Sequence, residues 1–317
     1  MFKLIVTFLF LSQSLYAGLL DQEDTKSSIS DLMYMPNEGT SILRGGYQVA
    51  NIDLNLKSNG STYYDADFTY NDSQVSIGHA IQKNFFFSLD IPYQLKEEVE
   101  FTYGPASSSN GNSTSETSNG LGDLEIALKW RGMEQKSSGY NLDLIVNISP
   151  KTGDAEDASS TKDGNNYRGG NKYLLGAEIG KKYSQIEFIG AFYLTLNAES
   201  ERKDLSDNEI TKEDSYQKMD IAAMVQYHIN SKLFINGGVN YIPSYSYDYK
   251  SGTTKSYLDY DSYLIYRLGI GSKLIDDFLI SFNYSAFDQD AELTSSGSKY
   301  PLNIVSSAYL FSLGYQF

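Results

Sequence analysis

The chain has 317 residues, no Cys and a formal net charge of -15 at pH 7. The acidic balance disfavours nucleic acid as a partner, and the lack of Cys excludes disulfide bridges and thiol chemistry. With 27 Tyr and 16 Phe but a mean hydropathy of -0.37, the composition is typical of a membrane barrel. In such a barrel aromatic side chains form girdles at both interfaces and polar side chains line the lumen.

Residues 1–17 have the features of a secretory signal peptide. One early cation, Lys3, precedes an apolar stretch from Leu4 to Leu11, and small or neutral residues lead to a cleavage point after Ala17. This stretch is about half of the roughly 20 residues that a membrane-spanning helix needs, and no later uncharged apolar stretch is as long. The sequence therefore predicts a secreted protein without helical membrane spans.

Residues 18–39 form a separate N-terminal segment. It contains Asp21, Glu23 and Asp24, followed by the apolar cluster Leu32-Met33-Tyr34-Met35. Two arrangements agree with this composition, a periplasmic leader or a small plug that folds back into the lumen. Residues 40–317 are expected to form the barrel itself.

Twelve segments of the mature chain alternate between apolar and polar residues, as strands between lipid and a lumen do. They cover residues 41–57, 63–80, 85–101, 121–132, 140–151, 172–182, 186–198, 216–229, 232–248, 257–273, 277–291 and 302–317. An even number of strands places both chain ends on the periplasmic side. The predicted fold is an all-β, transmembrane, antiparallel up-and-down β-barrel of about 12 strands.

The links between these segments are alternately long and short. The outer links are mostly rich in Ser, Gly or charge, and they are Asn59-Gly60, Gly104 to Gly120, Gly153 to Asn171, Glu199 to Asp214, Lys250 to Lys255 and Thr294 to Pro301. The inner links are short, the longest running from Glu134 to Gly139. Longer extracellular loops and short periplasmic turns are the rule in outer-membrane barrels.

The chain ends on an alternating aromatic strand. Tyr309, Phe311, Leu313, Tyr315 and Phe317 share one face of it. This strand resembles the C-terminal assembly signal of bacterial outer-membrane β-barrels, which implies recognition by the barrel assembly machinery through Tyr309-Phe317. It also implies residence in the cell outer membrane of a Gram-negative bacterium, with outer-membrane lipids and lipopolysaccharide as neighbours.

Charged residues identify the face of each strand that points into the lumen. In the fourth segment Leu128 and Trp130 share one face, and Lys129 and Arg131 share the other. A cation on the lipid face near the bilayer midplane costs about 2–4 kcal/mol, so the charged face must point inward. The same argument on every strand gives the candidate pore-lining residues Asp90, Asp123, Glu125, Lys129, Arg131, Asp143, Glu178, Lys182, Asp220, Asp261 and Arg267.

This inward set has two interpretations. Acids outnumber bases in it, which predicts at most a weak preference for cations. Alternatively, opposite charges satisfy one another and fix the barrel wall. Eight strands leave an interior filled by side chains and 16–18 leave an aqueous channel, so twelve should leave a narrow lumen that a few side chains can obstruct.

Two strands depart from simple alternation. The second changes its apolar parity between Tyr70 and Val75, which predicts a bulge at Asn71-Asp72-Ser73. In the ninth, Tyr241, Tyr245, Tyr247 and Tyr249 form an aromatic stripe. We expect this stripe to belong to the outer girdle, with a surface for stacking sugars or aromatic rings as the alternative.

The segments Gly120 to Arg131 and Val75 to Tyr93 together resemble an outer-membrane family, the phenol-degradation meta-pathway proteins. The first segment has that family's Gly-x-Gly-Asp strand in Gly120-Leu121-Gly122-Asp123, and the second has its preceding hairpin, which ends in Asp90-Ile91-Pro92-Tyr93. The stretch from Val75 to Arg131 that contains both is about a fifth of the chain. The resemblance implies a barrel of twelve or so strands that passes small, often aromatic or hydrophobic compounds.

These observations leave three classes of function. The resemblance favours a channel or uptake porin, and the acidic outer loops allow a closed structural or adhesive barrel. An outer-membrane lipid hydrolase is less favoured, because catalysis of that kind needs a base beside a nucleophile or metal. His79 and His228 are the only histidines, and both fall near the periplasmic turns. We expect no enzymatic activity, cofactor or metal.

Overall fold

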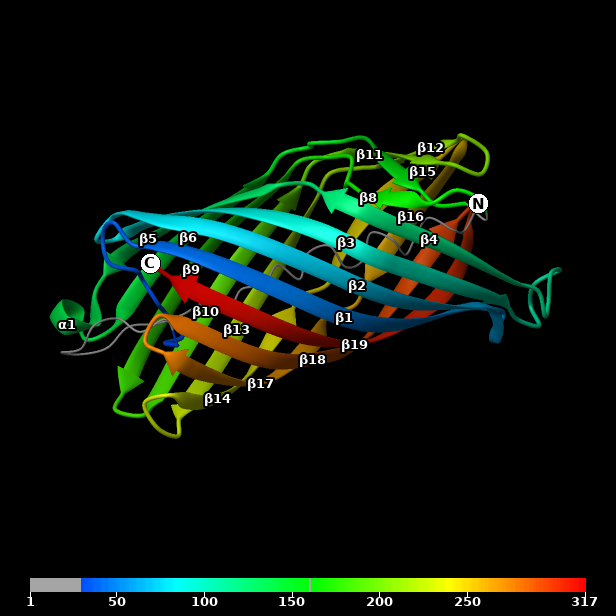
Figure 1. The fold of residues 1–317 in the computed structure, drawn as a ribbon. Coiled ribbons are helices and arrows are strands. Elements are labelled where there is room, and N and C mark those ends of the chain that lie inside the picture. Colours follow the sequence, from blue (N-terminus) through cyan, green and yellow to red (C-terminus); the bar gives the residue numbers. More distant parts are fainter. Residues whose placement is uncertain (1–29, 160) are drawn as a thin grey trace.

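The computed structural model describes residues 30–159 and 161–317. The predicted signal peptide and the first part of the N-terminal segment, up to residue 29, lie outside the described residues. The described chain forms a closed barrel of long, tilted, antiparallel strands (Figure 1). The predicted twelve-stranded antiparallel barrel is confirmed.

Twelve strands form the wall of the barrel at the level of the membrane. They are β1 (Ser41–Ser58), β2 (Ser61–Gln82), β3 (Phe85–Tyr103), β5 (Glu125–Met133), β6 (Asn141–Ser149), β9 (Lys172–Tyr183), β10 (Ile186–Asn197), β13 (Tyr216–His228), β14 (Leu233–Ile242), β17 (Tyr263–Ile275), β18 (Phe278–Ser295) and β19 (Ser298–Gln316). Each pairs antiparallel with the next, and β19 pairs with β1 to close the ring.

The first and last residues of the barrel, Ser41 and Phe317, lie at the end of the barrel where the turns are short. The Ser41 N–H donates to the Phe317 carbonyl, and the Phe317 N–H donates to the Ser41 carbonyl, each at 2.9 Å. Short turns mark the periplasmic end of an outer-membrane barrel, so we call this the periplasmic end and the opposite one the extracellular end. At the extracellular end Asn59 (φ 50°) and Gly60 (φ 80°) form the tight hairpin between β1 and β2.

The longest periplasmic link contains the short helix α1 (Gln135–Ser138). It ends at Gly139, whose φ of 84° favours glycine and whose N–H donates to the Gln135 carbonyl. Within the part of the chain that the structure describes, no helix is long and apolar enough to cross a membrane.

Seven further strands complete a ring at the extracellular end, which β18, β19, β1, β2 and β3 close. They are β4 (Ser113–Gly122), β7 (Ala155–Asp157), β8 (Gly164–Asn166), β11 (Ser200–Asp204), β12 (Ile210–Glu213), β15 (Tyr245–Ser251) and β16 (Thr254–Tyr260). The β7–β8 hairpin lies between β4 and β11, with which it pairs in parallel. The predicted outer loops are therefore partly wrong, because the strands continue beyond the bilayer. Most of Glu199 to Asp214 is the β11–β12 hairpin, and β4 begins at Ser113.

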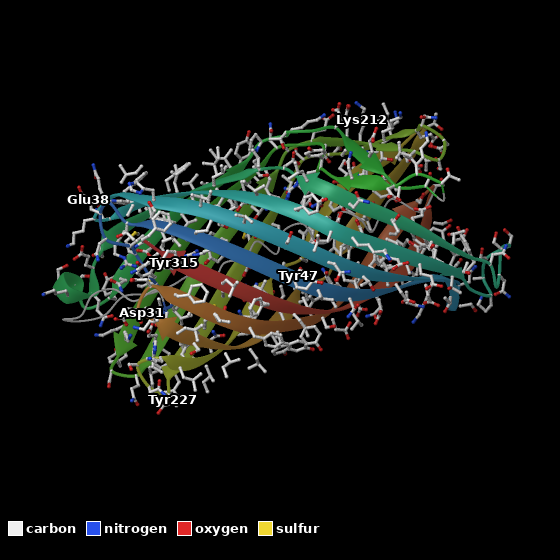
Figure 2. The ribbon with its side chains drawn as sticks, viewed as in Figure 1. Asp31, Glu38, Tyr47, Lys212, Tyr227 and Tyr315 are labelled. Carbon is white, nitrogen blue, oxygen red and sulfur yellow. The ribbon has the colours of Figure 1, made fainter. Side chains whose placement is uncertain are left out.

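The polarity of the two faces reverses along the strands. Near the periplasmic end, apolar side chains point outward and are exposed, such as Leu43 and Tyr47 on β1. Further along β1 the apolar side chains Ile52, Leu54 and Leu56 are buried inside, while polar ones point outward. We call the first region the membrane half and the second the extracellular half. Figure 2 shows Tyr47, Tyr227 and Tyr315 among the side chains of the membrane half.

A bulge lies at the level predicted for Asn71-Asp72-Ser73, between β2 and β3, but its extra residue is not on β2. The three predicted residues pair with Val49, Gln48 and Tyr47 of β1 without a shift. The parity change reflects the reversal of surroundings, because inward positions of β2 change from polar to apolar at Tyr70. The extra residue at this level is Leu95 on the facing strand β3.

The interior of the extracellular half is a hydrophobic core, which we call the extracellular core. It includes Leu56, Phe68, Tyr260 and Leu293, all nearly or fully buried. Tyr247 and Tyr249 are also buried there, and Tyr245 packs against it, whereas Tyr241 is exposed on the outer surface. The girdle prediction is therefore wrong for three of the four tyrosines, because the break at Pro243-Ser244 turns the following odd-numbered residues inward.

Candidate functional site

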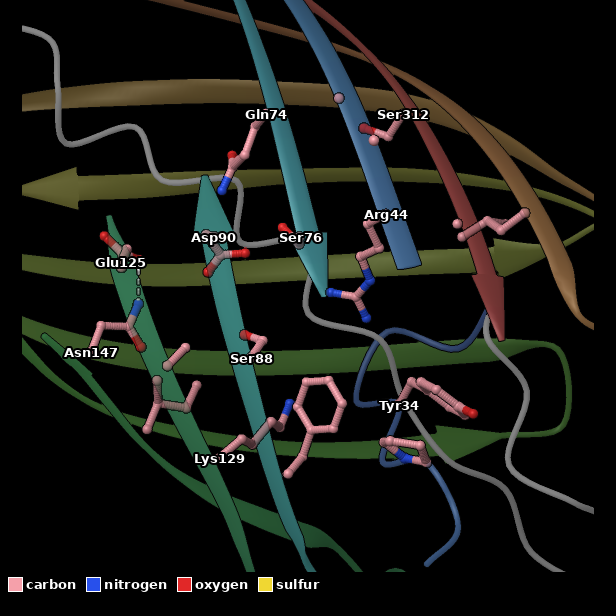
Figure 3. A pocket seen from close by; sticks show the side chains of 18 of the residues that line it. Tyr34, Arg44, Gln74, Ser76, Ser88, Asp90, Glu125, Lys129, Asn147 and Ser312 are labelled. Atoms are coloured by element: carbon pink, nitrogen blue, oxygen red, sulfur yellow. Dashed lines mark hydrogen bonds between the residues drawn. The ribbon is translucent and has the colours of Figure 1, made fainter. Parts of the chain in front are cut away.

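A cavity of about 150 Å³ lies inside the membrane half. Its wall comes mainly from β1, β2, β3, β5, β6, β18 and β19, and the side chains that line it include Arg44, Ser76, Asp90, Glu125 and Lys129 (Figure 3). Apolar groups also line it, namely Phe86, Ala127, Ile145 and Leu279. The cavity is thus amphipathic, as sites for small organic ligands are.

Residues 30–36, which we call the plug segment, form one boundary of this cavity through Tyr34 and Pro36. Met33 is fully buried in a cluster with Ile145, Leu174 and other inward residues of the wall. A methyl group added at Gly180 would lie 2.5 Å from the Met33 sulfur. The absence of a side chain at Gly180 therefore makes room for Met33 against the wall. The plug segment is therefore packed inside the barrel rather than free in the periplasm.

Polar contacts also fasten the plug segment. The Leu32 N–H donates to Glu187 at 2.9 Å, and the Gln226 amide donates to the Ser30 carbonyl at 2.8 Å. A guanidinium N–H of Arg131 donates to the Met33 carbonyl. Three polar side chains near the periplasmic ends of the wall strands thus form hydrogen bonds with backbone groups of the plug segment.

Asp31 of the plug segment is fully buried and paired with the wall. Lys182 lies 2.8 Å from Asp31 and 3.1 Å from Glu187, and His228 contacts Glu187. Asp31, Glu187 and His228 are close enough that their ligand atoms could surround a metal ion. Lys182 already supplies the cation between the two carboxylates, so we regard this group as an ion-pair cluster.

Four of the predicted inward residues of β5, β6 and β9 form one network. Arg131 holds Asp143 through two hydrogen bonds of 2.7 and 3.0 Å. Lys129 lies 2.9 Å from Asp143 and 3.0 Å from Glu178, which also accepts a hydrogen bond from Tyr193. The side chains are nearly buried, so their charges compensate one another rather than face an open aqueous pore.

Four other predicted residues also point inward. Glu125 accepts from Asn147 at 2.7 Å and lies 3.4 Å from Lys172. Asp220 accepts two hydrogen bonds from Asn240, and Arg267 is half-buried on β17. The fourth, Asp90, is half-buried in the cavity wall.

Asp123 and Asp261 lie at breaks between strands. Asp123 is buried where β4 gives way to β5, and it accepts from the backbone N–H groups of Thr152 and Arg168. Asp261 lies between β16 and β17 and is exposed, so its place among the buried inward residues is wrong. The break there reverses the alternation, because Tyr260 before it and Tyr263 after it are both buried inside.

Strand alternation does not identify Arg44 as an inward residue, although its side chain lines the cavity. Its neighbours in the sequence, Leu43 and Gly45, give a weak alternation at the start of β1. The charge itself was the available signal, since a cation in the membrane half of a strand must face inward. The plug contacts of Asp31 had no comparable signal, because they join residues more than 150 positions apart.

Tyrosine rings stack within the extracellular core. The ring centroids of Tyr216 and Tyr247 are 4.5 Å apart, and those of Tyr245 and Tyr260 are 4.7 Å apart. Lys218 donates to the Tyr263 hydroxyl at 3.1 Å and lies 5.4 Å from the Tyr245 centroid. A cation beside stacked rings provides a surface with aromatic and cation–π character.

Buried charges also occur inside the extracellular ring. Arg202 is 1% exposed, lies 3.0 Å from Asp157 and donates to the Tyr167 carbonyl. Burial raises the pKa of Asp157 to about 6, against the opposing effect of Arg202. Burial likewise raises the pKa of Glu213 to about 8. Both groups lie outside the membrane, since the outward pair Glu201 and Lys212 on the same hairpin is in solvent.

No protein-family model matches the sequence, and no curated protein is significantly similar to it. The structure is similar to that of an outer membrane channel from Pseudomonas putida F1, with a TM-score of 0.57 and 13% identity over 94% of this chain and 100% of that chain. It is also similar to the transport unit of the autotransporter AIDA-I from Escherichia coli, with a TM-score of 0.52 and 12% identity over 95% of each chain. The chain therefore has the fold of bacterial outer-membrane β-barrels.

Proposed function

We propose that this chain is an outer-membrane channel that admits small solutes, hydrophobic or aromatic ones among them. The cavity in the membrane half carries the proposal, because it lies where a solute would cross the bilayer. Its volume of about 150 Å³ is comparable to an engineered protein cavity that binds benzene. Its mixed lining offers a ring an apolar wall and offers polar substituents hydrogen-bond partners.

Two further features support this function. The structure is similar to an outer membrane channel over that channel's full length. The stacked tyrosines beside Lys218 belong to the extracellular core, so an aromatic solute would contact them as the side chains of that core part. The resemblance of Gly120 to Arg131 to the phenol-degradation family favours the same class of solute.

A channel of this design opens by movement at both ends of the cavity. At the periplasmic end the plug segment must leave, and its strongest tie is the pairing of Asp31 with Lys182. At the extracellular end the side chains of the extracellular core must part. Replacing Lys182 leaves Asp31 and Glu187 without their shared lysine, and this favours release of the plug segment.

Ion conductance tests the proposal in the full chain refolded into a planar bilayer. We expect low or intermittent conductance for the unaltered chain and several-fold higher open probability for Lys182→Met. Lys181→Met is the matched control, because Lys181 is the next residue on β9 and contacts the ring of Tyr183 instead of the plug segment. Uptake of a small aromatic solute into vesicles should rise in the same variant.

The competing function is a closed structural or adhesive barrel that acts through its acidic outer surface. The extracellular core favours it, since Leu56, Tyr260 and Leu293 fill the barrel and are 0% exposed. Absence of conductance in the unaltered chain, in Lys182→Met and in a chain lacking residues 30–36, with folding verified in each, would overturn the channel and support this alternative.

A further inference from the structure

We infer that the cavity binds a small zwitterion, a free amino acid being the simplest, with its carboxylate at Arg44 and its ammonium group at Asp90. The inference rests on the proposed channel function and names the class of solute that the cavity recognises. It follows from two opposite charges in the cavity wall that act on each other without forming an ion pair.

Arg44 is a half-buried cation, and the charge of Asp90 acts on it without an ion pair between the two. Among the described residues it forms no ion pair, and its Nε is buried without a hydrogen-bond partner. The Ser312 hydroxyl, on the strand next to β1, is likewise buried without a partner and lines the same cavity. Two unsatisfied donors on adjoining strands are suited to a carboxylate, which accepts from both at once.

Asp90 is the acid whose charge acts on Arg44. It accepts a hydrogen bond from Ser76, and no Lys, Arg or His among the described residues lies in ion-pair contact with it. The carboxylate of Glu125 is its direct cross-strand neighbour, and like charges in that position repel. An ammonium group beside Asp90 would relieve this repulsion.

The barrel wall places these groups in one row. Arg44 on β1 is opposite Ser76 on β2, and Ser76 is opposite Asp90 on β3. Two strand spacings of about 4.8 Å separate the backbones of Arg44 and Asp90. Figure 3 shows both side chains on either side of Ser76, directed into the same space. The two charges act on each other but form no ion pair among the described residues, and one small solute would bridge them.

The other charges of the cavity already have partners. Lys129 pairs with Asp143 and Glu178, and Glu125 accepts from Asn147 and lies near Lys172. A solute with a single negative charge would meet Arg44 but also the field of Asp90. A solute with a single positive charge would meet Asp90 but also the field of Arg44. A zwitterion satisfies both groups, and the apolar side chains of Phe86 and Ile145 accommodate its remaining part.

Three probes that share a phenylethyl skeleton test the inference: phenylalanine, 3-phenylpropanoate, which lacks the ammonium group, and 2-phenylethylamine, which lacks the carboxylate. Their dissociation constants are measured by titration calorimetry with the full chain in micelles, unaltered and as Lys182→Met. A hydrogen bond to a charged group contributes about 1.5–3 kcal/mol, so phenylalanine should bind at least roughly tenfold more tightly than either singly charged probe.

Variants assign each charge to its partner. Arg44→Gln should weaken phenylalanine and 3-phenylpropanoate about tenfold and leave 2-phenylethylamine unchanged, and Asp90→Asn should do the converse. Lys57→Gln on β1 and Glu100→Gln on β3 are matched controls, because both residues are exposed on the extracellular half. Neither control should alter any of the three affinities.

Equal affinities for the three probes would overturn the inference. A preference for phenylalanine that persists unchanged in Arg44→Gln and Asp90→Asn would overturn it as well. Conductance of Lys182→Met separates this failure from failure of the channel. A conducting variant with no preference for phenylalanine removes only the zwitterion site. Tight phenylalanine binding in a protein that never conducts retains the site and removes the channel.

Discussion

The membrane half and the extracellular half share β1, β2, β18 and β19 but distribute polarity in opposite ways. In the membrane half these strands expose Val75, Ile77 and Phe311 and turn polar groups inward. In the extracellular half they expose acids and bury residues such as Leu54 and Phe68. Alternation along a strand therefore shows only that its two faces lie in different environments. Whether the apolar face points outward depends on whether lipid or water surrounds that part of the barrel.

Chemistry also distinguishes how each half is held together. The membrane half relies on buried ion pairs and on the plug segment, whereas the extracellular half relies on apolar packing around stacked tyrosines. A charge should therefore be tolerated inside one region and destructive inside the other. Four substitutions and a pH titration probe this difference.

The largest effect is expected for Leu54→Asp, which places a carboxylate in the extracellular core. Leu54 is 1% exposed, and truncating a buried Leu to Ala alone costs about 2–5 kcal/mol. Burying an unpaired charge adds to this cost. The free energy of unfolding, measured by urea titration in lipid vesicles, should fall further than that range. The exposed neighbour variant Asn51→Asp should leave it nearly unchanged, and equal losses would contradict the assignment of the core.

Arg131→Met should lower the free energy of unfolding by about 3–5 kcal/mol, because removing one partner of a buried pair leaves Asp143 partly uncompensated. Lys129 still lies 2.9 Å from Asp143, so we expect the lower end of that range. Lys83→Met removes an exposed pair with Glu134 and should cost less than about 1 kcal/mol. The same urea titration measures both, and similar losses would show that burial does not distinguish the pairs.

Ile221→Lys tests the outer surface of the membrane half. Ile221 points outward from β13 and is exposed, and a lysine facing lipid near the midplane costs about 2–4 kcal/mol. Thr69→Lys, outward on the extracellular half of β2, should stay within about 0.5 kcal/mol of the unaltered chain. A comparable cost at both positions would mean that the bilayer extends over the extracellular half.

The smallest effect concerns pH and the extracellular ring. The raised pKa values of Asp157 (about 6) and Glu213 (about 8) mean that the folded ring binds more protons than the unfolded chain. This contribution to stability is complete below about pH 4, where the unfolded carboxylates are protonated, and is lost as pH rises through about 6 and then about 8.

Amide hydrogen exchange in residues 155–166 and 210–213, corrected for its intrinsic pH dependence, should therefore accelerate between pH 5 and pH 9. Glu213→Gln should flatten the upper part of this dependence. Glu201→Gln is the control, because Glu201 lies on the outward face of β11 and is exposed. A slope that survives Glu213→Gln would assign it to other groups.

Much of the membrane half follows from its sequence. Where charged and apolar residues alternate, as from Glu125 to Arg131, the cost of a charge in lipid fixes the inward face. The extracellular half did not follow in the same way, because Tyr245, Tyr247 and Tyr249 give the same alternation whether they face lipid or a core. Two-residue breaks such as Pro243-Ser244 also invert the face, and hydropathy does not locate them.

The candidate site was predictable only in part. Asp90, Glu125 and Lys129 came from strand alternation and all line the cavity. Arg44 required attention to a single charge in a Gly-rich stretch. The pairing of Asp31 with Lys182 depends on closure of the whole barrel, since the two residues meet only after most of the wall has formed between them.

The reversal of polarity also determines how deep the barrel sits in its membrane. A deeper position would draw the outward acids of β1, β2 and β3, such as Asp53, Asp67 and Glu100, towards hydrocarbon. A shallower one would lift outward apolar residues, such as Val75 and Ile77, towards water. The boundary between the halves thus sets the depth of the barrel in the bilayer, and with it the depth of the cavity.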